Sequence, residues 1–202
     1  MKIHHPGIII SAAGRSSRLG RPKQLLPFGD GNLITHAVAT ANDAARGPVA
    51  VVLGAYADDI IPHLSGLNTS VVINPDWPSG MASSIRTGIG FFEENYPETD
   101  GLLFMVCDQP WLTQSVISGL FSLQNEQNTP AAACIYAGAP GTPALFHKSV
   151  FQALKNLKGD RGAGKLLREM SEVISKLDFP EGLHDIDTED EYRELLKRLS
   201  LP

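Results

Sequence analysis

Short runs of β-branched and other apolar residues alternate along the chain with amphipathic or Ala-rich segments of helical length. The apolar runs have the length and composition of buried strands, and the segments between them have the spacing of helices that cover a sheet. The expected strands span residues 8–10, 49–54, 69–74, 101–107, 130–136, 142–146 and 173–178. The expected helices span residues 33–46, 58–64, 113–125, 148–157 and 189–199, with two more beginning near Ser79 and Asp160. This alternation predicts an α/β fold with a mostly parallel sheet, right-handed crossovers and helices on both faces.

One region departs from this alternation. The two short apolar stretches at 130–136 and 142–146 flank a segment dense in Gly and Pro. That density favours a bent hairpin or an insertion over another helical crossover. Because we find no repeat, low-complexity tract or linker, we expect one domain over residues 1–202.

Composition and net charge are those of an ordinary globular protein. Hydrophobic residues make up 43% and charged residues 19% of 202 residues, which suffices for a packed core. The formal net charge of −5 argues against nucleic-acid binding through bulk electrostatics. No apolar run approaches the ~20 residues of a membrane span, and the first residues lack the apolar core of a signal peptide. Cys107 and Cys134 have apolar neighbours, which favours buried thiols and a cytoplasmic location.

A basic loop follows the first expected strand. Small residues lead into four cations within nine residues, and the first acidic residue of the chain is Asp30. The cations are Arg15, Arg18, Arg21 and Lys23. Small residues let backbone N–H groups approach an anion, while Arg and Lys add charge and forked donors. Since open α/β sheets bind ligands at the carboxyl ends of strands, the pattern favours a phosphate-binding loop, with a solvated basic turn as the alternative.

Two familiar phosphate loops are excluded. The dinucleotide fingerprint G-x-G-x-x-G fails because Ser16 stands where its second Gly belongs. Residues 159–165 have the spacing of a Walker loop, but Leu166 replaces the hydroxyl residue that binds Mg²⁺ and the preceding segment has helical spacing.

Acidic residues at two distant positions are candidate metal ligands. Asp108 ends the expected strand over 101–107, where it serves either as a metal ligand or as a cap for the helix expected from Thr113. Asp185 and Asp187 share one side of an extended segment, although acids also favour the start of a helix. Thr188 and Glu191 fit a capping box that starts the last helix.

The segment over residues 74–88 predicts a strand, a loop and a helix whose amino end offers N–H donors to a ligand. Asn74 ends the strand, and Gly80 allows the backbone to approach closely. An ordinary loop with Trp77 as a hydrophobic plug explains these residues equally well.

The chain carries A-A-G-x-S-x-R-L-G-x-P-K-x-L-L-P over residues 12–27. This stretch resembles the signature loop of the MobA-like nucleotidyltransferases, most closely the branch that attaches cytidylate to the molybdenum cofactor. The resemblance runs nearly the full length through Asp-Gln-Pro at 108–110, Gly-x-Pro-x-x-Phe at 141–146, Gly-Asp-x-Gly-Ala at 159–163 and Ile-Asp-Thr at 186–188. It implies a Rossmann-like, mostly parallel but mixed sheet of the nucleotide-diphospho-sugar transferase (GT-A-like) fold.

The resemblance also implies roles for individual residues. The expected catalytic residues are Lys23, Arg18 and Asp108. The expected ligands of Mg²⁺ (or Mn²⁺) are Asp108 and Asp187, with Asp185 as the alternative to Asp187. The expected nucleotide-binding residues are Ala12, Ala13, Gly14, Arg15, Ser16, Arg18, Lys23, Asn74, Gly80, Ser84 and Asp108, of which Gly80 and Ser84 match positions that contact the base. The expected acceptor-binding residues are Gly141, Pro143, Asp160 and Gly162, and Asp160 serves equally well as a helix cap.

The expected activity is transfer of CMP from CTP to a phosphate acceptor, with molybdopterin first among the candidate acceptors. Relatives that use CTP tend to carry Ala at the position of Ala13, whereas guanylyl-transferring relatives tend to carry Gly. Thr142 departs from the His that many relatives place before the Pro, which leaves the acceptor open. The alternatives are another acceptor (methylerythritol phosphate or a sugar 1-phosphate), a GTP-using guanylyltransferase, or a non-catalytic cofactor-delivery protein. Docking to a molybdenum enzyme is also open, and neither a nucleic-acid nor a membrane partner is expected.

Overall fold

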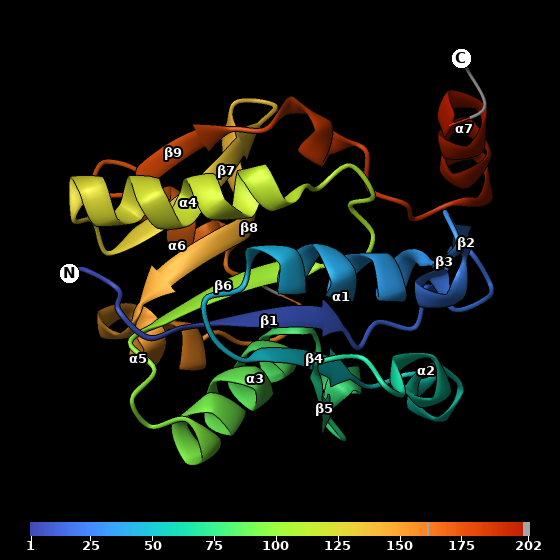
Figure 1. Cartoon of the computed structure of the whole chain (residues 1–202), viewed down its shortest axis with the longest axis horizontal. Helices are drawn as coiled ribbons and strands as arrows, with labels where there is room; N and C mark the ends of the chain where they lie inside the picture. Colours follow the sequence, from blue (N-terminus) through green and yellow to red (C-terminus); the bar gives the residue numbers. More distant parts are fainter. Residues whose placement is uncertain (161, 200–202) are drawn as a thin grey trace.

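A seven-stranded sheet forms the centre of the computed structural model, which describes residues 1–160 and 162–199 (Figure 1). The strands of this sheet are β1 (Pro6–Ala12), β4 (Val49–Leu53), β5 (Ser70–Ile73), β6 (Gly101–Val106), β7 (Ala131–Tyr136), β8 (Ala139–His147) and β9 (Ser175–Asp178). Their spatial order is β5-β4-β1-β6-β8-β7-β9, and β8 pairs antiparallel with both of its neighbours. The other described pairings in this sheet are parallel, so the expected mostly parallel, mixed sheet is confirmed.

Helices cover both faces of this sheet. The α-helices are α1 (Leu33–Ala44), α2 (Ala57–Leu64), α3 (Met81–Asn95), α4 (Gln114–Gln127), α5 (Phe151–Lys155), α6 (Gly164–Glu169) and α7 (Glu189–Leu199). Side chains of α1, α2 and α4 pack with Ile8 and Ile10 on one face, and those of α3, α5 and α6 pack with Ile9 on the other. The alternation of Ile8, Ile9 and Ile10 between two cores explains why this run is apolar at every position.

The smaller elements connect these layers. The short 3₁₀ helices are η1 (Lys23–Leu25), η2 (Trp77–Ser79), η3 (Lys148–Val150) and η4 (Pro180–Leu183). Strands β2 (Pro27–Phe28) and β3 (Gly31–Asn32) pair in a small antiparallel ribbon. Helix α7 lies at one edge of the molecule, beside this ribbon (Figure 1). Its Tyr192 and Leu195 form a third apolar cluster with Leu26, Leu33 and Ile186.

The Gly- and Pro-rich region forms a hairpin, as expected. Strand β8 is longer than the sequence pattern indicated, because it begins at Ala139 and pairs with β7 through a bulge between Ala133 and Cys134. The helix expected over 148–157 is a 3₁₀ turn followed by the short α5, which ends at Lys155.

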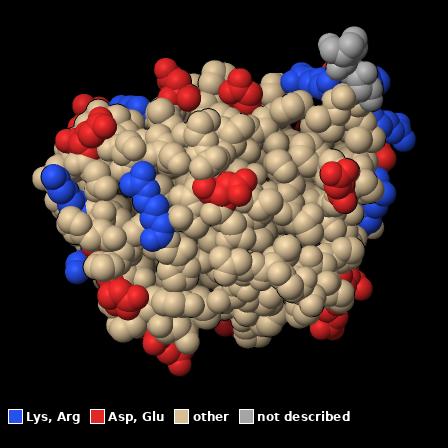
Figure 2. Space-filling model, viewed as in Figure 1, with Lys and Arg blue, Asp and Glu red and all other residues tan. Residues whose placement is uncertain are grey.

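Acidic and basic side chains are interspersed on the face shown in Figure 2. Within residues 1–160 and 162–199, the model has no helix with both the length and the hydropathy needed to span a bilayer.

Candidate active site

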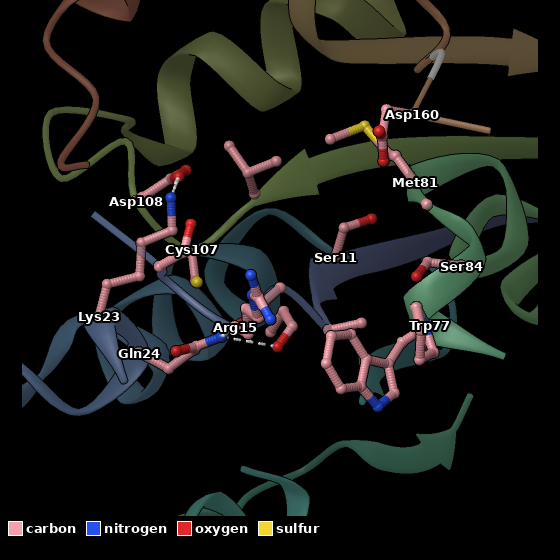
Figure 3. A pocket seen from close by; sticks show the side chains of 17 residues that line it. Ser11, Arg15, Lys23, Gln24, Trp77, Met81, Ser84, Cys107, Asp108 and Asp160 are labelled. Carbon is pink, nitrogen blue, oxygen red and sulfur yellow. Dashed lines mark hydrogen bonds and ion pairs between the residues drawn. The ribbon is translucent and has the colours of Figure 1, made fainter. Parts of the chain in front are cut away.

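A cavity with a volume of about 660 Å³ lies at the carboxyl ends of β1 and β6 (Figure 3). It is lined by Ser11, Ala12, Ala13, Gly14, Arg15, Ser17, Lys23, Gln24, Trp77, Pro78, Gly80, Met81, Ser84, Val106, Cys107, Asp108 and Asp160. Strands β1 and β6 are parallel neighbours, so the loops that follow them open on the same edge of the sheet. This position is where an open α/β sheet binds its ligand.

The loop after β1 is held by a buried amide. Gln24 is 1% exposed, and its Nε2 donates to the carbonyl oxygens of Ala12 at 2.8 Å and Gly14 at 2.9 Å. Ser16 Oγ accepts a hydrogen bond from the backbone N–H of Lys23 at 3.1 Å. These hydrogen bonds fix the loop from within the protein. The sequence did not reveal this role of Gln24, because its only signal is a polar residue beside Leu25 and Leu26.

Lys23 lies between two carboxylates that are far apart in the sequence. Its Nζ forms ion pairs with Asp108 and, at 2.7 Å, with Asp187 Oδ1. Arg18 forms an ion pair with the other oxygen of Asp187. We call this network of Arg18, Lys23, Asp108 and Asp187 the Lys23 end of the site.

Backbone contacts bring the two carboxylates together. The N–H of Ile186 donates to the carbonyl oxygen of Asp108 at 3.0 Å, which places the segment before α7 beside the end of β6. Glu191 Oε2 accepts from the N–H groups of Asp187 at 2.9 Å and Thr188 at 2.8 Å, and Thr188 Oγ1 accepts from the N–H of Glu191. The expected capping box is confirmed, and it fixes the backbone that carries the Asp187 carboxylate.

The charges at the Lys23 end stabilise one another. Burial by itself lowers the pKa of Lys23, but the charge of Asp108 and hydrogen bonds to Asp108 and Asp187 outweigh it, so the pKa is raised. Burial opposes ionisation of Asp187, yet its bonds and charge interactions with Lys23 and Arg18 lower its pKa. Burial raises the pKa of the neighbouring Cys107 to about 12, so this thiol stays protonated at neutral pH.

A divalent cation fits the donors at this end. Asp108 Oδ1 is buried and has no hydrogen-bond partner among the described residues, which leaves an acceptor open to a cation. Mg²⁺ prefers oxygen ligands and is commonly held by one or two carboxylates together with substrate phosphates. Asp185 forms no ion pair or hydrogen bond with Lys23 among the described residues, and it lines a separate cavity with Trp111 and Leu195. Desolvation, followed by the charges of Asp108 and Asp187, raises the pKa of Asp185, although the charge of Lys23 opposes this rise.

The other end of the cavity carries Trp77, Met81 and Ser84, and we call it the Trp77 end (Figure 3). Gly80 adopts φ +100°, and a Cβ there would meet the backbone of Gly159 and Asp160 at 2.4 and 2.6 Å. The N–H of Ala82 donates to the carbonyl oxygen of Gly159 at 3.1 Å. Only a glycine lets this loop close on the start of α3, which places Asp160 in the cavity wall.

The remaining expected site residues lie outside the cavity lining. Ser16 and Arg18 support the loop and Asp187, and Asn74 lies beneath the Trp77 end. Gly141 and Pro143 lie in β8, where their neighbour Thr142 contacts Gln109 beside Asp108. Gly162 packs near Met81, and Arg161 of the same element lies outside the described residues.

Comparisons with known proteins place the chain in a family. Residues 8–173 match the MobA-like NTP transferase domain. The chain is 28% identical to nicotine blue oxidoreductase of Paenarthrobacter nicotinovorans, over 93% of this chain and 95% of that protein. It is 25% identical to molybdenum cofactor cytidylyltransferase of Escherichia coli K12, over 93% of this chain and 97% of that protein.

Solved structures are similar over almost the whole chain. The crystal structure of Rv0371c from Mycobacterium tuberculosis H37Rv aligns with a TM-score of 0.84 and 30% identity, over 98% of this chain and 100% of that chain. A structure of Rv0371c in complex with manganese aligns with a TM-score of 0.80 and 28% identity, with the same coverage.

Proposed function

This chain belongs to the MobA-like NTP transferase family and is a nucleotidyltransferase, and on that premise we propose that it transfers CMP from CTP to a phosphate group of a small acceptor. Molybdopterin is the first candidate acceptor, because the E. coli relative is named molybdenum cofactor cytidylyltransferase and matches along nearly its full length. The observation that carries the proposal is that Lys23 and Asp108 line one end of the cavity beside a loop of small residues, and that Lys23 also forms an ion pair with Asp187.

The reaction needs no general base on the protein. A phosphate oxygen of the acceptor is ionised at neutral pH, and it would form a bond to the α-phosphorus of CTP as the bond to the bridging oxygen breaks. Pyrophosphate leaves with that electron pair, and CMP remains on the acceptor. Catalysis then consists of alignment and charge neutralisation, which matches a site without a His or Cys dyad among its described residues.

Individual residues would divide this work. Lys23 and Arg18 exchange their carboxylate partners for phosphate oxygens and neutralise the charge that develops on the α- and β-phosphates. Arg15 lines the cavity without an ion pair in the described structure, so it is available to the phosphates from the start. Asp108 and Asp187 would hold Mg²⁺ or Mn²⁺, which when bound supplies further neutralisation of the phosphate oxygens.

The test is to incubate the protein with Mg²⁺ or Mn²⁺ and each of the four nucleoside triphosphates, with and without molybdopterin, and to measure pyrophosphate. We expect pyrophosphate only with CTP and acceptor together. Glucose 1-phosphate and methylerythritol phosphate serve as parallel acceptors, and turnover with one of them instead would replace molybdopterin in the proposal. Equal turnover with GTP and CTP contradicts the base assignment, and binding of CTP without pyrophosphate under every condition favours a delivery protein.

The relative named nicotine blue oxidoreductase supports a second candidate, a redox enzyme that uses the same cavity. The loop that would hold a triphosphate would equally hold the diphosphate of a dinucleotide. The test is oxidation of NADH or NADPH in the presence of a conjugated organic acceptor, measured as loss of the absorbance of the reduced nicotinamide. Such oxidation would distinguish this candidate from the transferase.

A further inference from the structure

Asn74 lies directly after β5 and is buried beneath the Trp77 end, with 1% of its surface exposed. Its side chain makes three hydrogen bonds to the segment that follows. Asn74 Oδ1 accepts from the backbone N–H of Asp76 at 3.0 Å. Its Nδ2 lies 2.8 Å from Ser83 Oγ and 3.0 Å from Ser84 Oγ.

The chemistry of these partners fixes the orientation of the Asn74 amide. A backbone N–H can only donate, so the atom facing Asp76 must be the amide oxygen. The amide nitrogen therefore faces the two serines, and both of its protons are donated to their hydroxyl oxygens. Each serine then has one proton of its own left to donate.

The two serines use that proton differently. Ser83 Oγ donates to the carbonyl oxygen of Gly80 at 2.8 Å, so its proton is consumed inside the protein. Ser84 Oγ has no acceptor among the described residues, and Ser84 lines the cavity between Trp77 and Met81 (Figure 3). The hydroxyl of Ser84 therefore keeps an unused proton at the wall of the cavity.

We propose that Asn74 is a positioning residue for Ser84, the serine that the family resemblance assigns to the nucleobase. Asn74 fixes the Ser84 hydroxyl as a hydrogen-bond donor, so that the site takes a base that presents an acceptor there. The adjacent O2 and N3 atoms of cytosine are such acceptors. The proposal rests on the proposed function, because it takes the Lys23 end as the phosphate site and the Trp77 end as the base site. Asp160 places a carboxylate at the Trp77 end, and its negative charge disfavours the opposite orientation of a triphosphate.

The test measures binding of CTP by calorimetry, without acceptor, to the wild type and to two matched variants. Ser84→Ala removes the donor that faces the cavity, and Ser83→Ala removes the neighbouring hydroxyl bonded to the same amide. We expect Ser84→Ala to weaken CTP binding about 3- to 10-fold, the worth of one hydrogen bond, and Ser83→Ala to change it less than ~2-fold. Ribose 5-triphosphate, which lacks the base, should bind equally to the wild type and to Ser84→Ala.

A double-mutant cycle tests whether Asn74 acts through Ser84. Asn74→Ala should weaken CTP binding in the wild type and in Ser83→Ala, but should add no loss in Ser84→Ala. If Asn74→Ala weakens CTP binding as much in the Ser84→Ala background as in the wild type, Asn74 only supports the loop and the proposal is wrong. Thermal unfolding of each variant identifies those that fold.

If Asn74→Ala does not fold, Asn74→Asp provides an alternative test of the proposal. It retains an acceptor for the N–H of Asp76 but draws the proton of Ser84 inward, so the loss for CTP should exceed the loss for ribose 5-triphosphate, which meets the same added charge. Equal CTP binding by Ser84→Ala and Ser83→Ala overturns the inference alone. Wild-type protein that neither binds CTP nor releases pyrophosphate overturns the proposed function instead.

Discussion

The two ends of the cavity differ in how they are built. The Lys23 end joins residues from the first loop, from the end of β6 and from the segment before α7, and its ionised groups pair with one another. The Trp77 end comes mostly from one stretch, η2 and the start of α3, and neutral hydrogen bonds hold it in place. If the proposed function is correct, the Lys23 end would have to exchange partners to bind phosphate, whereas the side chains of the Trp77 end are already held in place by neutral hydrogen bonds.

This difference predicts that substitutions at the Lys23 end change the rate, while those at the Trp77 end change which nucleotide is chosen. A group that exchanges a carboxylate for phosphate acts most strongly as charge develops in the transition state. A preformed wall acts on the bound nucleotide from the outset and so determines affinity and selectivity.

Lys23→Ala should have the largest effect. We expect kcat to fall at least ~10²-fold, because the variant loses the cation that would neutralise charge on the phosphates in the transition state. Arg21→Ala is the matched control, since Arg21 belongs to the same loop but forms an ion pair with Glu189 at 2.8 Å and does not line the cavity. Pyrophosphate release under saturating CTP measures both, and wild-type turnover by Lys23→Ala would contradict the role of this residue.

Asp187→Asn should have the next largest effect, on metal binding. Loss of one ionised ligand should weaken binding of Mn²⁺ in the presence of CTP by at least ~10-fold, which electron paramagnetic resonance measures without turnover. Asp185→Asn removes a carboxylate two residues away that faces the other cavity, and it should change the affinity less than ~3-fold. The reverse ranking of these two variants would make Asp185 the ligand.

Ala13→Gly should have the smallest effect and should act on selectivity. Ala13 lines the cavity and is 6% exposed, so its methyl group would narrow the space available to a nucleobase there. Its removal should lower the ratio of kcat/KM for CTP to that for GTP by about 10-fold, with little change in kcat for CTP. Ala55→Gly is the control, because the N–H of Ala55 donates to the carbonyl oxygen of Ala13 from outside the cavity lining. An unchanged ratio would mean that a different residue of the cavity wall excludes purines.

The sequence predicted the local features of the molecule well. The β-branched runs at β1, β4 and β6 and the capping box of Thr188 and Glu191 depend on neighbours a few residues away, so periodicity and spacing reveal them. The position of Asp108 at the end of β6 follows from the same pattern. The bulged pairing of β7 with β8 and the short α5 were missed, because partner strands and tertiary packing set their limits.

The sequence by itself determined a mostly parallel sheet, a cationic loop at the end of its first strand, and acidic residues at two later positions. Tertiary structure alone decided that Lys23 bridges Asp108 and Asp187, that Gln24 clamps the loop, and that Asn74 lies beneath Ser84 rather than in the cavity wall. The physical reason is that helices, strands and caps are stabilised by short-range periodicity and hydrogen bonding. The partner of a buried polar group depends instead on which distant segments the packed core brings within about 3 Å of it.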